Sequence, residues 1–243
     1  MRFRFLLRSK RYRIRILAFL IVVFAVMASA SAILKSKKNN ADAAEVFYPI
    51  KGIHTEEKIY ALTANINGDE KEKDIDMLIS VCEGMGLRIT FFVEPDWIDE
   101  NPNIAKKLQK VGTLGLYINK NLNGKSRNYI MEYIASCNDD FFETSAKYPK
   151  YVRVAGNPDS LTTRILNSYG QYCISYDAVL TQGGGGTIAK GRIIDIGPIN
   201  EKTSFLLAQS VGEAITAGLT CIEMENFLYK IGSVTDEYGK QYA

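Results

Sequence analysis

Two hydrophobic patterns alternate along residues 59–224. Short apolar runs, rich in β-branched and aromatic residues, are typical of buried strands. We expect strands at 59–63, 88–93, 113–118, 151–154, 172–176, 192–196 and 220–224. The segments between them predict helices at 71–84, 102–111, 125–137, 160–168 and 203–217. Four of these helices are expected to end at or beside Gly84, Gly112, Gly170 and Gly218.

This alternation predicts an α/β fold in which helices cover a parallel sheet. About seven such units favour a (β/α) barrel. Functional side chains on that scaffold gather at the carboxyl ends of the strands, so we seek the candidate site there.

A different pattern occupies the N-terminus. Residues 16–34 form an uncharged, largely apolar run, long enough to cross a bilayer as a helix, and seven Arg and Lys residues precede it within residues 1–15. Because basic flanks stay in the cytoplasm, we expect a single-pass signal anchor in the cell membrane with the C-terminal domain outside the cytoplasm. A cleaved signal peptide is the alternative, since small residues at 28–30 and 41–43 would suit signal peptidase.

The net charge of +3 does not indicate a nucleic-acid partner, because residues 1–15 hold seven positive charges and the remainder is mildly acidic. Residues 35–50 read as a linker, 51–230 as one domain and 231–243 as a C-terminal tail. The glycine run at 183–186 predicts a flexible loop rather than a phosphate cradle, since no Gly-Lys-Ser/Thr follows it.

Cysteine and histidine limit the chemistry. Export permits disulfides. However, the apolar surroundings of Cys173 and Cys221 favour buried free thiols for these two and for Cys82 and Cys137. The sole histidine, His54, lies in a polar turn and is expected to be a solvated surface residue. A hydrolytic zinc site needs about three ligands, mostly His, Asp and Glu, so we expect no metal or other cofactor.

The order of several motifs carries a resemblance to a known family. The run IYALTANINGD at 59–69 is followed by TFF within 89–93, by Trp97 and by the Asn101–Pro102 pair. Together they resemble the polysaccharide deacetylase family of NodB type, in particular its exported sporulation branch. The resemblance covers about residues 51–228. It implies a distorted (β/α) barrel and metal-assisted hydrolysis of acetyl groups on cell-wall sugars.

Transferred to this sequence, the family's chemical groups are missing. The catalytic base falls on Asn65, the metal-binding Asp on Ile66, the two metal-binding His on Tyr117 and Asn121, and the catalytic His on Gly197. None of these side chains supplies the required base, ligand or acid. The resemblance therefore implies neither catalytic residues nor a metal site.

Residues suited to binding remain. Arg153 matches the family's Arg, which pairs with the base; here an acidic ligand group, Asp177 or Asp195 could take that place. Amide and tyrosine side chains suit sugar hydroxyls. The candidate binding residues are Thr63, Asn65, Asn67, Tyr117, Asn121, Arg153 and Asp177.

These observations predict a deacetylase-like protein, anchored in the membrane through residues 16–34, that has lost hydrolysis. Its expected role is binding cell-wall glycan or scaffolding an envelope or sporulation assembly with other proteins. One alternative is an active carbohydrate deacetylase or related hydrolase with a rearranged site built from Asp177, Asp195 or Glu94. Another is protein interaction through the barrel exterior.

Overall fold

A computed structural model describes residues 46–180 and 188–243. By its internal contacts the chain divides into Met1–Val46 and Phe47–Ala243, and the described structure belongs almost entirely to the second unit. The expected basic segment, the anchor at 16–34, the cleavage sites, most of the linker and the glycine run at 183–186 lie outside the described residues. Among those described, no helix is long and apolar enough to span a membrane.

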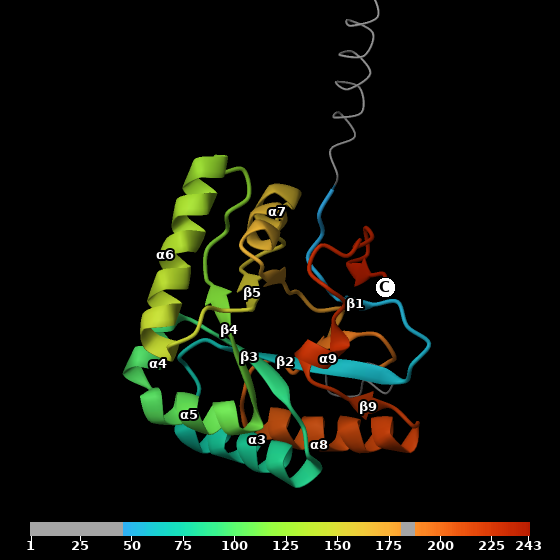
Figure 1. The fold of residues 1–243 in the computed structure, drawn as a ribbon. Coiled ribbons are helices and arrows are strands. Elements are labelled where there is room, and N and C mark those ends of the chain that lie inside the picture. Colours follow the sequence, from blue (N-terminus) through green and yellow to red (C-terminus); the bar gives the residue numbers. More distant parts are fainter. Residues whose placement is uncertain (1–45, 181–187) are drawn as a thin grey trace, which may run out of the picture. The chain divides into compact units, whose positions relative to one another are not determined.

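The main sheet is parallel and has the order β6-β5-β4-β3-β2-β8-β7, with β9 also pairing with β2 (Figure 1). All seven expected strands are present, although the fifth, at 172–176, and the last, at 220–224, are only two residues long. The strands of this sheet are β2 (Ile59–Ile66), β3 (Ile89–Val93), β4 (Gly112–Ile118), β5 (Tyr151–Val154), β6 (Tyr172–Cys173), β7 (Ala178–Val179), β8 (Ile193–Asp195) and β9 (Thr220–Cys221).

A short segment before β2 links the two sides of this curled sheet. Ile50 pairs in parallel with Ile174, just after β6, and Gly52 pairs in antiparallel fashion with Arg192, just before β8. The N–H of Ile193 also donates to the carbonyl of Lys51 at 2.9 Å. Strand β1 (Gly52–Ile53) in this segment pairs with β10 (Lys240–Gln241), so residues from both ends of 47–243 join beside the barrel.

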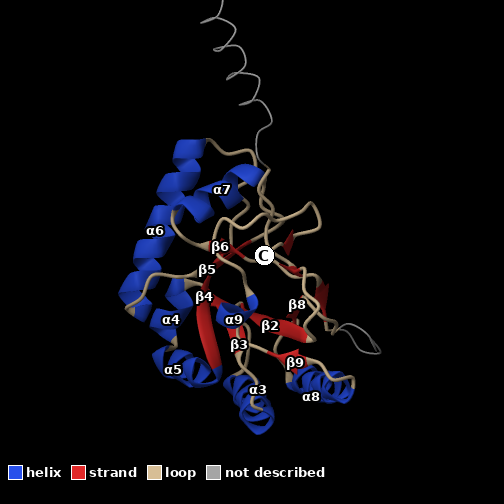
Figure 2. Ribbon diagram, turned by 45° about the vertical axis from the view of Figure 1, so that its right-hand side comes forward, coloured by secondary structure: helices blue, strands red, loops and turns tan. Residues whose placement is uncertain are grey.

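Helices surround the strands, as Figure 2 shows. Helix α3 contains Gly84 and ends at Met85, so the expected stop at Gly84 is wrong; Gly86, at φ 65°, caps the helix instead. The expected helix at 125–137 extends to Ser145. Two short helices, α4 and α9, were not expected. The helices are α3 (Glu72–Met85), α4 (Pro95–Glu100), α5 (Pro102–Val111), α6 (Arg127–Ser145), α7 (Ser160–Ser168), α8 (Glu201–Thr216) and α9 (Met224–Phe227).

The alternation of side chains along β2 determines which of them reach the barrel interior. Leu62, Ala64 and Ile66 belong to the core between the sheet and the helices, together with Leu78 of α3. Because successive side chains of a strand point to opposite faces, Thr63 and Asn65 project inward. This places the amide of Asn65 in the barrel and the side chain of Ile66 in the helix layer.

Candidate functional site

The candidate site is built at the carboxyl ends of β2, β4, β5 and β8. Register aligns Thr63 with Asp195 and Tyr117 with Arg153 in neighbouring strands. Since parallel strands end on one side of the sheet, these inward side chains meet there.

Arg153 is the centre of the site. One terminal nitrogen, Nη1, lies 2.5 Å from Oδ2 of Asp195 and donates to Oδ1 of Asn65 at 2.8 Å. The other, Nη2, donates to Oγ1 of Thr63 at 2.8 Å. The guanidinium carbon lies 4.2 Å from the ring centroid of Phe92, a cation–π distance. Three polar partners, all at the two terminal nitrogens, and one aromatic face therefore hold the guanidinium.

The ion pair is almost withdrawn from water, since the Arg153 and Asp195 side chains are 5% and 7% exposed. Burial lowers the pKa of Arg153, and the carboxylate of Asp195 acts in the opposite direction. The second oxygen of Asp195, Oδ1, accepts the Gly197 N–H at 2.9 Å. Asp195 is thus the acidic partner among the alternatives that the sequence left open for Arg153.

A more accessible rim surrounds this buried pair. Tyr117 is half-buried, and its pKa is raised first by burial and then by the carboxylate of Glu94. Oε1 of Glu94 accepts a hydrogen bond from the amide of exposed Asn119 at 3.3 Å. The ring of exposed Tyr176 lies 5.2 Å from the Arg153 guanidinium carbon. We call Asn65, Glu94, Tyr117, Asn119 and Tyr176 the polar rim.

Of the remaining candidates, Asn67, Asn121 and Asp177 have partners other than Arg153, and Thr63 contacts Arg153 but is closed to solvent. Asn67 is exposed, and its N–H donates to the Glu70 carboxylate at 3.0 Å. Asn121 is exposed and accepts the N–H of Asn123 at 3.0 Å. The carboxylate of Asp177 pairs instead with Arg192 and Lys240. Thr63 is fully buried. Of the seven candidates, Asn65 and Tyr117 are thus those that combine proximity to Arg153 with partial exposure.

The residues at the family's metal-binding positions do not fit a metal ion. Ile66 is an apolar side chain in the helix layer, Tyr117 belongs to the polar rim, and Asn121 is held by its own loop. Across 46–180 and 188–243, no group of three His, Cys, Asp or Glu side chains is placed to hold an ion.

The sequence predicts that His54 lies at the surface and that the four cysteines are free thiols. His54 is exposed, but it is not merely solvated: its Nε2 lies 2.8 Å from Oδ2 of Asp236, and its ring stacks on Tyr242 at 4.2 Å. All four cysteines are free thiols, as expected. Cys82 and Cys173 are buried, and Cys137 and Cys221 are half-buried.

Sequence reasoning missed two aromatic members of the site, Phe92 and Tyr176. The signal for Phe92 was present: in a strand reading TFF, one Phe must face each side of the sheet, and Phe92 is in register with Asn65. Tyr176 was placed in the expected strand at 172–176, but β6 ends at Cys173 and Tyr176 lies in the irregular segment before β7.

No protein-family model matches the sequence, and a search of curated proteins finds no match. Solved structures do match in fold. A CE4 family pseudoenzyme from Bacillus anthracis shares 15% identity over 79% of this chain and 70% of that chain, with a TM-score of 0.65. A peptidoglycan N-acetylglucosamine deacetylase shares 16% over 74% and 92%, with a TM-score of 0.64. A chitin deacetylase from the fungus Colletotrichum lindemuthianum shares 17% over 76% and 92%, with a TM-score of 0.61. The chain therefore has the fold of the CE4 polysaccharide deacetylases, which hydrolases and a pseudoenzyme both adopt.

Proposed function

We propose that this protein is a non-hydrolytic, deacetylase-like domain that binds cell-wall glycan at its polar rim and is held outside the cytoplasm by a membrane anchor at residues 16–34. One observation carries the loss of hydrolysis: where the family places its catalytic base, the amide of Asn65 accepts a hydrogen bond from Arg153. An amide lacks the basicity of a carboxylate and cannot take up a proton from water in this role.

The rearranged-hydrolase alternative has weaker support, because each carboxylate it requires is already engaged. Asp195 binds Arg153 with one oxygen and the Gly197 N–H with the other. Asp177 is shared by Arg192 and Lys240. Glu94 is the most available of the three, with the Asn119 amide as its partner.

Glycan binding is supported by the composition and accessibility of the polar rim. Tyr117 and Tyr176 offer aromatic surface, while Asn65, Glu94 and Asn119 offer amide and carboxylate groups for hydroxyls. Two proteins that share this fold are a peptidoglycan N-acetylglucosamine deacetylase and a chitin deacetylase. A similar ligand class suits the rim of this chain.

Calorimetric titration of the full-length chain with peptidoglycan fragments and chitooligosaccharides tests the proposal. We expect wild type to bind, and Tyr117→Ala to weaken binding about tenfold by removing a stacking and hydrogen-bonding group. Tyr238→Ala is the matched control, because Tyr238 is 69% exposed and lies just before β10, outside the set of rim residues. Absence of heat with wild type at millimolar sugar would refute glycan binding and favour a scaffold. Acetate release by wild type would refute the loss of hydrolysis.

The anchor requires its own measurement. Full-length protein should sediment with membranes, and its domain should be digested by protease added outside intact cells. A chain beginning after residue 34 should remain in the soluble fraction if the anchor proposal holds. Recovery of the full-length product in the soluble fraction, shortened at 28–30 or 41–43, would instead identify a cleaved signal peptide.

A further inference from the structure

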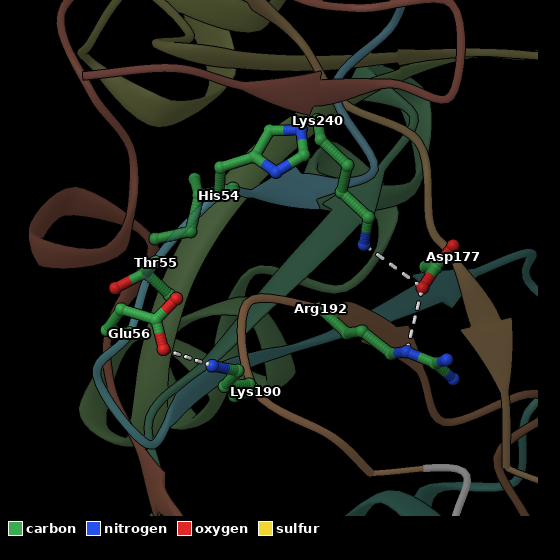
Figure 3. Close-up of a pocket in the computed structure, with 8 residues that line it drawn as sticks. His54, Thr55, Glu56, Asp177, Lys190, Arg192 and Lys240 are labelled. Carbon is green, nitrogen blue, oxygen red and sulfur yellow. Dashed lines mark hydrogen bonds and ion pairs between the residues drawn. The ribbon is translucent and has the colours of Figure 1, made fainter.

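A cleft of about 700 Å³ shares no lining residue with the polar rim, although Asp177, which lines it, directly follows Tyr176 of the rim. Lys190 and Arg192, which line it, precede β8, whereas Asp195 of the candidate site ends that strand. The other charged side chains come from distant parts of the chain: His54 and Glu56 follow β1, Asp177 precedes β7, and Lys240 lies on β10 (Figure 3). The fold thus gathers four basic side chains at the amino end of β8.

The cleft holds more positive than negative charge. Oδ2 of Asp177 lies 3.0 Å from Nε of Arg192 and 3.1 Å from Nζ of Lys240, so two cations share one carboxylate oxygen. Lys190 pairs with Glu56 at 2.7 Å. His54 pairs with Asp236 at 2.8 Å. Among the other side chains that line the cleft, the three cations Lys190, Arg192 and Lys240 face only the two carboxylates of Glu56 and Asp177.

This surplus is concentrated around Asp177. The side chains of Lys240 and Asp177 are only 19% and 24% exposed, so water screens the repulsion between Lys240 and Arg192 incompletely. A second anion between the two cations would reduce that repulsion and would occupy donors that Asp177 does not use.

The arrangement of the donors indicates the shape of that anion. Arg192 engages Asp177 through Nε, and Figure 3 shows its two terminal nitrogens beyond that contact. A planar carboxylate is bound best by two parallel N–H groups of one arginine. Here the Lys240 ammonium group comes from β10 and the Arg192 guanidinium from the segment before β8, so donors from two separate elements face Asp177, which suits a tetrahedral anion with oxygens on several sides.

We propose that this cleft binds a phosphate group. The proposal does not rest on glycan binding at the polar rim, and Tyr117→Ala should leave phosphate binding unchanged. Free phosphate and the phosphodiester of a polymer share the recognised chemistry, so both sources enter the test.

The test is calorimetric titration of the full-length chain at low ionic strength with inorganic phosphate, dimethyl phosphate and acetate. We expect phosphate to bind more tightly than acetate. Arg192→Gln and Lys240→Gln should each weaken binding about tenfold, because each removes a charge-assisted donor. Lys107→Gln is the control, since Lys107 pairs with Asp76 on a distant helix, and it should have no effect.

Asp177→Asn separates a binding role from a structural one. It removes the competing carboxylate, so phosphate should bind more tightly to this variant than to wild type. If the cluster only stabilised the fold, the same substitution would lower thermal stability without improving phosphate binding. Tighter binding of dimethyl phosphate would assign a polymer phosphodiester, and tighter binding of inorganic phosphate would assign the free ion.

Three outcomes would overturn the proposal. They are absence of phosphate binding to wild type, binding that both glutamine variants retain in full, and acetate binding as tight as that of phosphate. Thermal melting of each variant, recorded alongside, shows that any lost binding belongs to a folded protein.

Discussion

Arg153 and Asp195 form a buried ion pair across the interior of the curled sheet, with Nη1 and Oδ2 2.5 Å apart. Strands β4, β3 and β2 lie between β5 and β8 in the sheet order, so the pair connects strands that share no backbone hydrogen bonds. Thr63 bonds to both members, accepting from Arg153 at 2.8 Å and donating to Asp195 at 3.3 Å. Arg153, with its side chain 5% exposed, is therefore part of the barrel core and is closed to a ligand in solution.

Breaking this pair should destabilise the protein. Arg153→Gln and Asp195→Asn should each lower the free energy of unfolding by about 3–5 kcal/mol, because each leaves an uncompensated buried charge. The chain's single tryptophan, Trp97, is buried and can report unfolding in urea. Lys150→Gln, which breaks an exposed pair with Glu225, should cost at most about 1 kcal/mol. Comparable losses for the buried and exposed pairs would contradict this assignment.

The sequence predicted the order of the main elements because long apolar strands and periodic helices are local patterns. It also placed Arg153 at a strand end. It could not choose Asp195 over Asp177, since that choice depends on pairing between distant segments. Asp195 is in register with Thr63, whereas Asp177 directly precedes the two-residue strand β7 beside β8 and pairs with Arg192.

The strands that the sequence did not predict are very short. Strands β1, β7 and β10 have two residues each, too few for an alternating pattern to emerge. Gly84 suggested a helix end, but Gly86 adopts the left-handed conformation that terminates α3. The phosphate cleft was likewise invisible in the sequence, because His54, Arg192 and Lys240 converge only when β1 pairs with β10 and lies beside β8.

Restoring the base alone should not restore hydrolysis. Asn65→Asp places a carboxylate beside Arg153, but it leaves Ile66 in the helix layer and Gly197 without an acid. We expect no acetate release from chitooligosaccharide or peptidoglycan. Asn67→Asp, on the exposed loop beyond the same strand, is the matched control for an added charge. Acetate release by Asn65→Asp that the control lacks would show that the remaining groups suffice for hydrolysis.

The cysteines should resist alkylation while the protein is folded. Burial raises the pKa of Cys82, Cys173 and Cys221 to about 12, and it also raises that of half-buried Cys137. At about pH 8 the reactive thiolate is therefore much rarer than in an unfolded chain. Mass spectrometry after brief iodoacetamide treatment should find little labelling of native protein and four labels in urea. Rapid labelling of Cys173 in the native state would contradict its burial.

Asp159 caps the N-terminus of α7, and its carboxylate should make the protein more stable at neutral pH than at acidic pH. Partial burial raises its pKa, but backbone and side-chain hydrogen bonds from Thr162, and backbone hydrogen bonds from Gly124 and Leu161, outweigh this effect and hold the pKa below its ordinary value of 3.8. A carboxyl with a depressed pKa in the folded state stabilises the protein above its unfolded pKa and loses this contribution as the pH falls through the folded value.

Asp159→Ala should therefore lower the free energy of unfolding by about 1 kcal/mol at about pH 6, and by less at about pH 3. Ser126 is the matched control, because its hydroxyl caps α6 by accepting the Tyr129 N–H at 3.3 Å and does not titrate. Ser126→Ala should cost the same at both values of pH. Urea titrations of wild type and both variants at each pH give the four differences. A loss for Asp159→Ala that does not change with pH would show that the cap acts through hydrogen bonding alone, without the carboxylate charge.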